Sequence, residues 1–139
     1  EREEVLNRPI DREVARRVGM TNLLPAEIDA HGIARIDAEH SIPTGHRGAP
    51  GRGWIGLRPE HLKVDIGRGE GEPIGNGEVT ELVSDGILTT LSIAWAGHSL
   101  RTHLVAGRGM ARELRPGDAV SLAVRGGDVR VWLSEIPRE

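Results

Sequence analysis

Apolar and polar residues alternate over most of the second half of this chain, as they do in β-strands that bury one face. The clearest run is 87–95, where large or β-branched residues occupy every odd position. Shorter runs of the same kind follow at 100–104, 120–124 and 129–133. The Gly-Gly-Asp sequence at 126–128 predicts a turn, after which the run 129–133 folds back along the run 120–124. These segments predict a β-rich domain of short strands and tight turns.

The first half shows the same strand pattern with more interruptions. Its apolar positions predict strands at 23–28, 33–36, 54–57 and 62–66. Asp29-Ala30-His31-Gly32 has the composition of a hairpin loop between the first two. Pro and Gly are concentrated at 41–53 and 67–73, which we expect to be loops, and the region near 67–77 is a candidate internal boundary. Short strands at regular spacing favour a small barrel or a sandwich, and we expect the barrel because closure removes exposed strand edges.

Residues 11–19 carry the start and stop signals of a short helix. Asp11 is a common N-cap residue, apolar residues stand at positions 14, 15 and 18, and Gly19 follows the last turn. A helix of two turns is marginal in water unless it packs on a surface. Because the chain opens in a charged segment and does not begin with Met, we expect it to be part of a longer protein that supplies this surface.

Composition narrows the classes of partner. The 139 residues include 18 Lys and Arg against 21 Asp and Glu, for a net charge of −3. With this acidic balance, no Phe or Tyr and only three Trp, we expect neither a cationic face for nucleic acid nor an aromatic platform for single-stranded bases. The lack of cysteine removes disulfides and thiolate chemistry, and no run approaches the roughly 18 apolar residues of a membrane span.

Candidate chemistry is sparse. His98 and His103 are five residues apart, so on a strand they point to opposite faces and do not share a metal ion by local geometry. Without cysteine or a known ligand spacing, we expect no metal site. The Gly-rich stretch 67–71 carries acids where a phosphate would lie, and no serine has the G-x-S-x-G context of a nucleophile. We therefore expect no catalytic residue and no bound cofactor in this chain.

The stretch Arg58-Pro59-Glu60-His61 places charged residues between two apolar segments. Arg, Glu and His are residue types common in active sites. A proline, however, ends strand pairing and pushes the residue before it into extended geometry. We interpret the stretch as a corner where one strand stops and the next begins at Leu62, with a hydrogen-bonded pair of Arg58 and Glu60 worth about 0.2–1 kcal/mol if exposed.

Several short segments of this sequence occur together in one known family. They are Glu3-Glu4-Val5 with Arg8-Pro9, Val14-Ala15 with Gly19, Asn22 to Ala26, Gly56 to His61, and Gly117 to Leu122. In this order they resemble the C-terminal region of the ATP-binding subunits of bacterial ABC importers, which carries the transport-associated OB (TOBE) domain. The resemblance covers nearly the whole chain. The aromatic residues usual near the helix and the chain end are absent, so the resemblance implies no particular transported solute.

The resemblance implies that residues 1–21 are the tail of the nucleotide-binding domain and that residues 22–139 form a mainly β, OB-like small barrel preceded by the short helix. It implies a non-catalytic regulatory and dimerisation domain, with ATP and Mg²⁺ bound only in the upstream domain. The implied partners are a second copy of the subunit, the permease subunits, and a regulatory protein or small effector, on the cytoplasmic face of the membrane. The residues assigned to the family motif, with a structural role, are Asn22, Arg58, Pro59, Glu60 and His61.

The sequence also leaves open a second function, the binding of a small ligand. Related OB-like domains of molybdate systems bind oxyanions, and a small-ligand module of that kind is the alternative function. Its candidate donors are Arg101, Arg108 and backbone amides near Gly107 and Gly109. An OB-fold nucleic-acid binder is the third reading, and the acidic balance and missing aromatic residues disfavour it.

Overall fold

The computed structural model describes residues 22–65, 71–105 and 114–133, and in these ranges the chain forms strands joined by loops and two short 3-10 helices. The elements are β1 (Asn22–Ile28), β2 (Ile33–Arg35), β3 (Ser41–Pro43), β4 (Gly51–Leu57), η1 (Pro59–His61), β5 (Lys63–Asp65), β6 (Glu72–Ser84), β7 (Leu88–Trp95), β8 (His98–Val105), β9 (Ala119–Val124), η2 (Gly126–Asp128) and β10 (Arg130–Leu133). The helix expected at 11–19, and with it the division at residue 21, lies outside the described residues.

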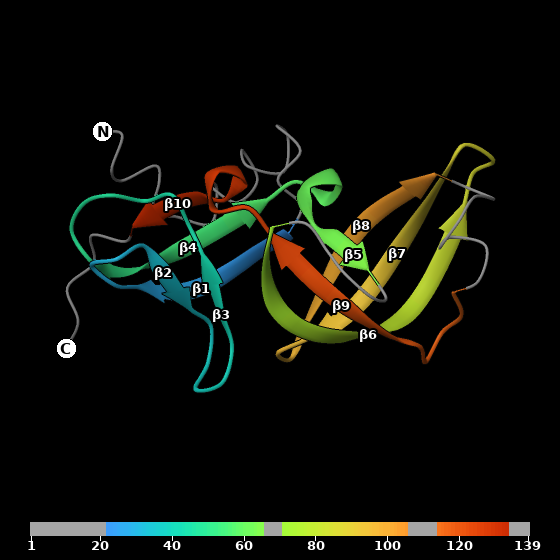
Figure 1. The fold of residues 1–139 in the computed structure, drawn as a ribbon, viewed down its shortest axis with the longest axis horizontal. Helices are drawn as coiled ribbons and strands as arrows, with labels where there is room; N and C mark the ends of the chain where they lie inside the picture. The colour runs from blue at the N-terminus through green and yellow to red at the C-terminus, as the bar shows by residue number, and fades with distance from the viewer. Residues whose placement is uncertain (1–21, 66–70, 106–113, 134–139) are drawn as a thin grey trace.

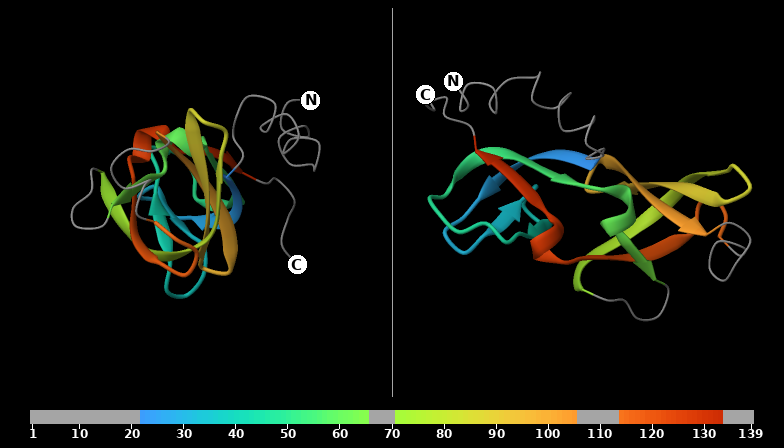
Figure 2. Two further views of the ribbon diagram at one scale, coloured as in Figure 1. Left: turned by 90° about the vertical axis from the view of Figure 1, so that its right-hand side faces the viewer. Right: turned by 90° about the horizontal axis from the view of Figure 1, so that it is seen from above.

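The described strands form two five-stranded antiparallel sheets that lie end to end along the long axis of the molecule (Figures 1 and 2). The first has the order β10-β4-β1-β2-β3, and the second has the order β5-β9-β6-β7-β8. The strands expected from alternation at 23–28, 33–36, 54–57, 62–66, 87–95, 100–104 and 120–124 are present, with small shifts at their ends. The sequence therefore predicted most of the elements of both sheets.

The chain crosses between the sheets twice, each time through a 3-10 helix. It leaves the first sheet after Leu57 and enters the second through η1, then returns through η2 into β10. The turn at 126–128 is present, but the expected return of 129–133 along the preceding strand is wrong, because β10 pairs with β4 and not with β9. Of residues 67–77, where the sequence suggested an internal boundary, 72–77 lie within β6 and 67–70 lie outside the described ranges.

β6, the longest of the described strands, bends and pairs with two neighbouring strands. Its first half pairs with β9 and its second half with β7, and the register shifts once between Pro73 and Gly75 and again between Val79 and Glu81. Gly75 has φ +110°, which side chains rarely adopt, so glycine permits the first bulge. Bulges increase local twist, and the sheet curls around the long axis in the left view of Figure 2. The expected mainly β, OB-like fold is confirmed.

The segment 41–53, expected to be a loop, is partly strand. β3 lies inside it and pairs with β2, and β4 begins at Gly51. β3 contributes Ile42 to the hydrophobic core, where this side chain is 3% exposed. A single apolar residue among Pro, Gly and polar neighbours gives no alternation to detect, so only the pairing with β2 reveals the strand.

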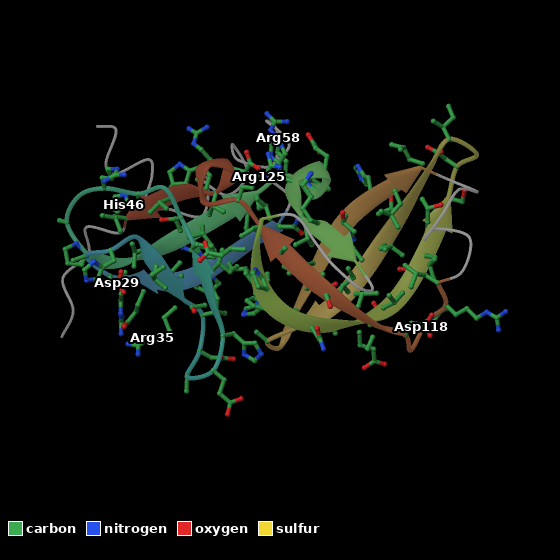
Figure 3. All side chains as sticks on the ribbon, viewed as in Figure 1. Asp29, Arg35, His46, Arg58, Asp118 and Arg125 are labelled. Carbon is green, nitrogen blue, oxygen red and sulfur yellow. The ribbon has the colours of Figure 1, made fainter. Side chains whose placement is uncertain are left out.

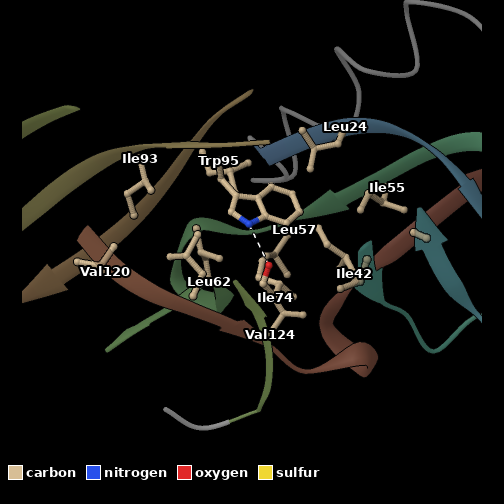
Figure 4. Packing of buried hydrophobic residues seen from close by; sticks show 14 of the residues in the cluster. Leu24, Ile42, Ile55, Leu57, Leu62, Ile74, Ile93, Trp95, Val120 and Val124 are labelled. Carbon is tan, nitrogen blue, oxygen red and sulfur yellow. Dashed lines mark hydrogen bonds between the residues drawn. The ribbon is translucent and has the colours of Figure 1, made fainter. Parts of the chain in front are cut away.

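One hydrophobic core is shared by both sheets. Leu24, Ile42 and Ile55 of the first sheet belong to the same buried cluster as Ile93 and Val120 of the second (Figure 4). The alternation at 87–95 holds for the buried face of β7, except that its first member, Ile87, is 75% exposed in the turn before the strand. The continuous core makes the two sheets one folded unit.

Candidate functional site

The Arg58-Pro59-Glu60-His61 stretch is the first crossing between the sheets. Arg58 is extended, with φ −72° and ψ 147°, and its carbonyl oxygen accepts a hydrogen bond from the His61 backbone N–H at 2.9 Å. The Leu62 backbone N–H donates to the Pro59 carbonyl at 3.2 Å, which closes one 3-10 turn. Pro59 is buried and Leu62 is 2% exposed. The corner therefore points its apolar residues inward and its charged residues outward.

Thr102, a buried residue on β8, forms hydrogen bonds with the backbone of this corner. The Thr102 hydroxyl lies 2.7 Å from the Leu62 carbonyl oxygen and 3.0 Å from the Pro59 carbonyl oxygen, and it donates to this pair. Thr102 is 1% exposed. The carbonyl groups of the first η1 residue and of the residue that follows η1 thus share one hydroxyl donor in the interior, where an unsatisfied acceptor is costly.

The charged side chains of the corner interact weakly. Arg58 Nη1 and Glu60 Oε2 are 4.0 Å apart, and the two side chains are 40% and 54% exposed. Figure 3 shows Arg58 projecting away from the sheets. At this distance and exposure, solvent screens most of the attraction. The backbone of the corner is therefore held mainly by Thr102 and not by the ion pair.

His61 is the last residue of η1 and is partly buried. Its Nδ1 atom is buried and has no hydrogen-bond partner in the described part of the chain. A catalytic imidazole is normally oriented by a carboxylate or backbone carbonyl on one nitrogen and faces the reacting group with the other. Among the described residues, neither a carboxylate nor a hydroxyl is bonded to His61 Nδ1.

Asn22 joins β1 of the first sheet to β8, an edge strand of the second sheet. Its Nδ2 donates to the Arg101 carbonyl at 2.8 Å, and its Oδ1 accepts from the Arg101 backbone N–H at 2.7 Å. The amide thus supplies the donor and acceptor that a neighbouring strand would supply to β8. Asn22 is 4% exposed, so both bonds lie in a mostly dry environment. Asn22 therefore links the two sheets through two hydrogen bonds.

A second contact between the sheets involves His40 and Trp95. The His40 ring meets the Trp95 indole edge to face at a centroid distance of 5.1 Å. The indole N–H donates to the Ile74 carbonyl at 3.0 Å (Figure 4). His40 Nδ1 lies 2.8 Å from Asp37 Oδ1. The Glu39 backbone N–H and the His40 side chain both donate to Asp37, and these bonds lower the pKa of that carboxyl. The Asp37 and His40 pair thus fixes the ring against the second sheet.

Other candidate chemistry is dispersed. Within residues 22–65, 71–105 and 114–133, no group of three His, Asp or Glu side chains is placed to hold a metal ion. Of the candidate oxyanion donors, Arg101 is exposed on β8, and residues 107–109 lie outside the described ranges. None of the helices in the described chain is long and apolar enough to cross a membrane.

Sequence reasoning located the corner and Asn22 but missed Thr102 and the Arg101 backbone. Thr102 stood on the expected buried face of a strand, between Leu100 and Leu104. A polar residue on a buried face requires a partner, and that was the available signal. The identity of the partner was not readable, because Thr102 is 40 and 43 residues away from Leu62 and Pro59.

Three comparisons relate this chain to known proteins. The family model of the TOBE domain matches residues 55–132. The Fe(3+) ions import ATP-binding protein FbpC of Pseudomonas fluorescens is 35% identical over 102 residues, which are 73% of this chain and 28% of that protein. The chain thus spans little more than a quarter of the length of this relative.

A solved structure shares the fold. It is the cytoplasmic molybdate-binding protein ModG with molybdate bound, with a TM-score of 0.69 and 10% identity, covering 82% of this chain and 96% of that one. At this identity the likeness establishes the fold alone. The matched family model extends from β4 to β10, through both crossings and the whole second sheet. Because it covers more than half of the sequence, the chain belongs to the TOBE domain family.

Proposed function

We propose that this chain is the non-catalytic C-terminal part of the ATP-binding subunit of an ABC importer, where it supports subunit pairing and the regulation of ATP-driven solute uptake. The observation that carries the proposal is the 35% identity over 102 residues to an import ATP-binding protein. The geometry agrees with it, because the family-motif residues Asn22 and Pro59 lie in the junctions that hold the two sheets together. Their work is structural.

The partners follow from the same proposal. ATP and Mg²⁺ bind to a nucleotide-binding domain that precedes this chain, and the permease subunits are reached through that domain. A second copy of the subunit and a regulatory protein or small effector contact the TOBE domain itself. The subunit then works at the inner face of the cell membrane.

The test begins with the coding sequence immediately before Glu1. We expect it to encode a G-x-x-x-x-G-K-[ST] phosphate-binding loop followed by the signature sequence of ABC ATPases. The 139-residue chain should give no heat on titration with Mg-ATP, whereas the full subunit should bind and hydrolyse it. Deletion of the chain from Asn22 onward should leave nucleotide binding intact and weaken subunit pairing, measured by light scattering, or ATP-coupled uptake. An upstream sequence without these motifs would overturn the proposal.

Small-oxyanion binding is the second candidate function. The fold likeness to a protein named as molybdate-binding favours it, and Arg101 is an exposed donor of suitable charge. Calorimetric titration of the chain with molybdate, sulfate and phosphate distinguishes the two functions, because only the second predicts heat at micromolar ligand. A flat titration with all three anions would remove this candidate and leave the first untouched.

A further inference from the structure

A cavity of about 320 Å³ lies at the end of the first sheet, between the β1–β2 loop and the segment that follows β3. Its lining residues are Ala30, His31, Thr44, Gly45, His46, Arg47 and Gly48. Asp29 and His46 mark this end of the molecule in Figure 3. The volume is at the lower end of the range for small-molecule sites, roughly 300–1,000 Å³. It has room for a small ligand.

The walls of this cavity are held in place by hydrogen bonds. The Gly32 carbonyl accepts from both the backbone N–H of Thr44 at 2.8 Å and its hydroxyl at 2.6 Å. The Thr44 oxygen in turn accepts from the His46 N–H at 3.0 Å, and His46 Nε2 donates to the Ala49 carbonyl at 3.2 Å. Gly32 has φ +83°, and a Cβ there would lie 2.8 Å from the His46 carbonyl oxygen. The two loops are therefore joined in one arrangement before any ligand arrives.

Every ionisable residue that lines the cavity is basic: His31, His46 and Arg47. Arg47 makes no ion pair within the described chain, in contrast to Arg35 and Arg52, which both pair with Glu27. The guanidinium of Arg47 thus keeps its full hydrogen-bonding capacity, which suits the oxygens of an anion.

Asp29 is a carboxylate on the loop beside the cavity, and its charge attracts His31. Asp29 Oδ1 accepts the backbone N–H groups of His31 at 2.8 Å and Ile33 at 3.0 Å, and these bonds lower the pKa of its carboxyl. Asp29 supports the loop and does not line the cavity. η2 also adjoins the cavity, since its Gly126 carbonyl oxygen lies 3.5 Å from a Cβ built on Gly45. The acidic residue of η2, Asp128, does not line the cavity.

We propose that this cavity is a binding site for a small multivalent oxyanion, held by Arg47 together with His31 and His46. The inference does not depend on the importer proposal, and it places any oxyanion site at the end of the first sheet and not at Arg101 on β8. Imidazole N–H groups donate hydrogen bonds to anion oxygens, so the two histidines add donors to those of the Arg47 guanidinium.

Sulfate is the probe, because it keeps its double charge between pH 6 and pH 8. Calorimetric titration of the chain with sulfate at pH 6 should show saturable binding, with heat beyond that of dilution. Arg47→Gln and His31→Gln should each weaken binding at pH 6 by about tenfold, the size expected for one charge-assisted hydrogen bond. Both residues are exposed, so these variants should keep the thermal unfolding midpoint of the original chain.

Two control variants separate this site from its alternatives. Arg35→Gln removes an arginine from the same end of the sheet but outside the cavity, and it should change sulfate affinity by less than about twofold. Arg101→Gln removes the rival donor on β8 and should have no effect. Binding that is lost in Arg101→Gln but kept in Arg47→Gln would overturn the inference in favour of the second candidate function. Absence of sulfate binding at pH 6 would overturn both and leave the importer proposal standing.

Discussion

At the residue scale, the buried hydroxyl of Thr102 contributes more to the stability of the corner than the exposed charges of Arg58 and Glu60. Thr102 serves two carbonyl groups in the interior, whereas Arg58 and Glu60 meet at 4.0 Å in solvent. A hydrogen bond made in a dry environment leaves a costly unsatisfied group when it is removed, while an exposed ion pair is exchanged for water. The two kinds of residue therefore differ sharply in their expected effect on stability.

Thr102→Val removes the hydroxyl with almost no change of shape. It should lower the free energy of unfolding by about 1–3 kcal/mol, because the buried Leu62 carbonyl oxygen loses its side-chain donor, while the Pro59 carbonyl keeps the Leu62 N–H. Urea denaturation followed by circular dichroism measures the change. Thr102→Ser keeps the hydroxyl, and Arg58→Ala removes only the exposed pair, whose worth is about 0–1 kcal/mol. If Arg58→Ala proved more damaging than Thr102→Val, the corner would depend on its charges after all.

At the element scale, β6 shapes the second sheet because it passes close to both neighbours. Gly77 lies in the middle of this strand, where a Cβ would collide with Ile93 Cγ2, stand 3.0 Å from the Ala94 carbonyl oxygen, and stand 3.2 Å from Leu122 Cδ1. Glycine in a strand interior lowers strand propensity. Here the close approach of β7 and β9 explains its presence.

Gly77→Ala should therefore destabilise the protein even though alanine favours extended structure more than glycine does. The expected loss is about 1–3 kcal/mol, the usual cost of overfilling a packed interior. Gly127→Ala is the matched control, because a Cβ at Gly127 meets no atom within 4 Å. Thermal unfolding of both variants gives the comparison. Equal midpoints would mean that β6 has room to shift away from its neighbours.

At the scale of the whole molecule, one core and two polar junctions make the sheets a single unit. The buried cluster includes residues of both sheets, and Asn22 and Thr102 attach β1 and η1 to β8. A chain with one continuous core of this size is expected to unfold in one cooperative step. Circular dichroism and tryptophan fluorescence should then report the same transition, because Trp95 lies at the junction and Trp54 and Trp132 lie in the first sheet.

Asn22→Ala tests the junction between the sheets. It leaves the Arg101 N–H and carbonyl without their partner, and we expect a loss of about 1–3 kcal/mol in the free energy of unfolding. Asn76→Ala, at an exposed position on β6, is the control and should change stability by less than about 0.5 kcal/mol. A loss in Asn22→Ala no larger than that of the control would show that the core alone joins the sheets.

The sequence by itself determined the β class, most strand positions and the corner at Pro59, because alternation, turn composition and proline geometry act over a few neighbouring residues. It also singled out Asn22 and the Arg58 to His61 stretch through their resemblance to a family. It did not reveal β3, whose single buried residue, Ile42, has no local pattern.

The tertiary structure alone decided which strands pair and what the conspicuous residues do. β10 joins β4 because the chain crosses back to the first sheet, and no local signal specifies that crossing. Asn22 finds its partner 79 residues away at Arg101, and the basic residues of the cavity come from two separate loops. Contacts between distant segments depend on the packing of the entire chain, so they become visible only once the sheets are assembled.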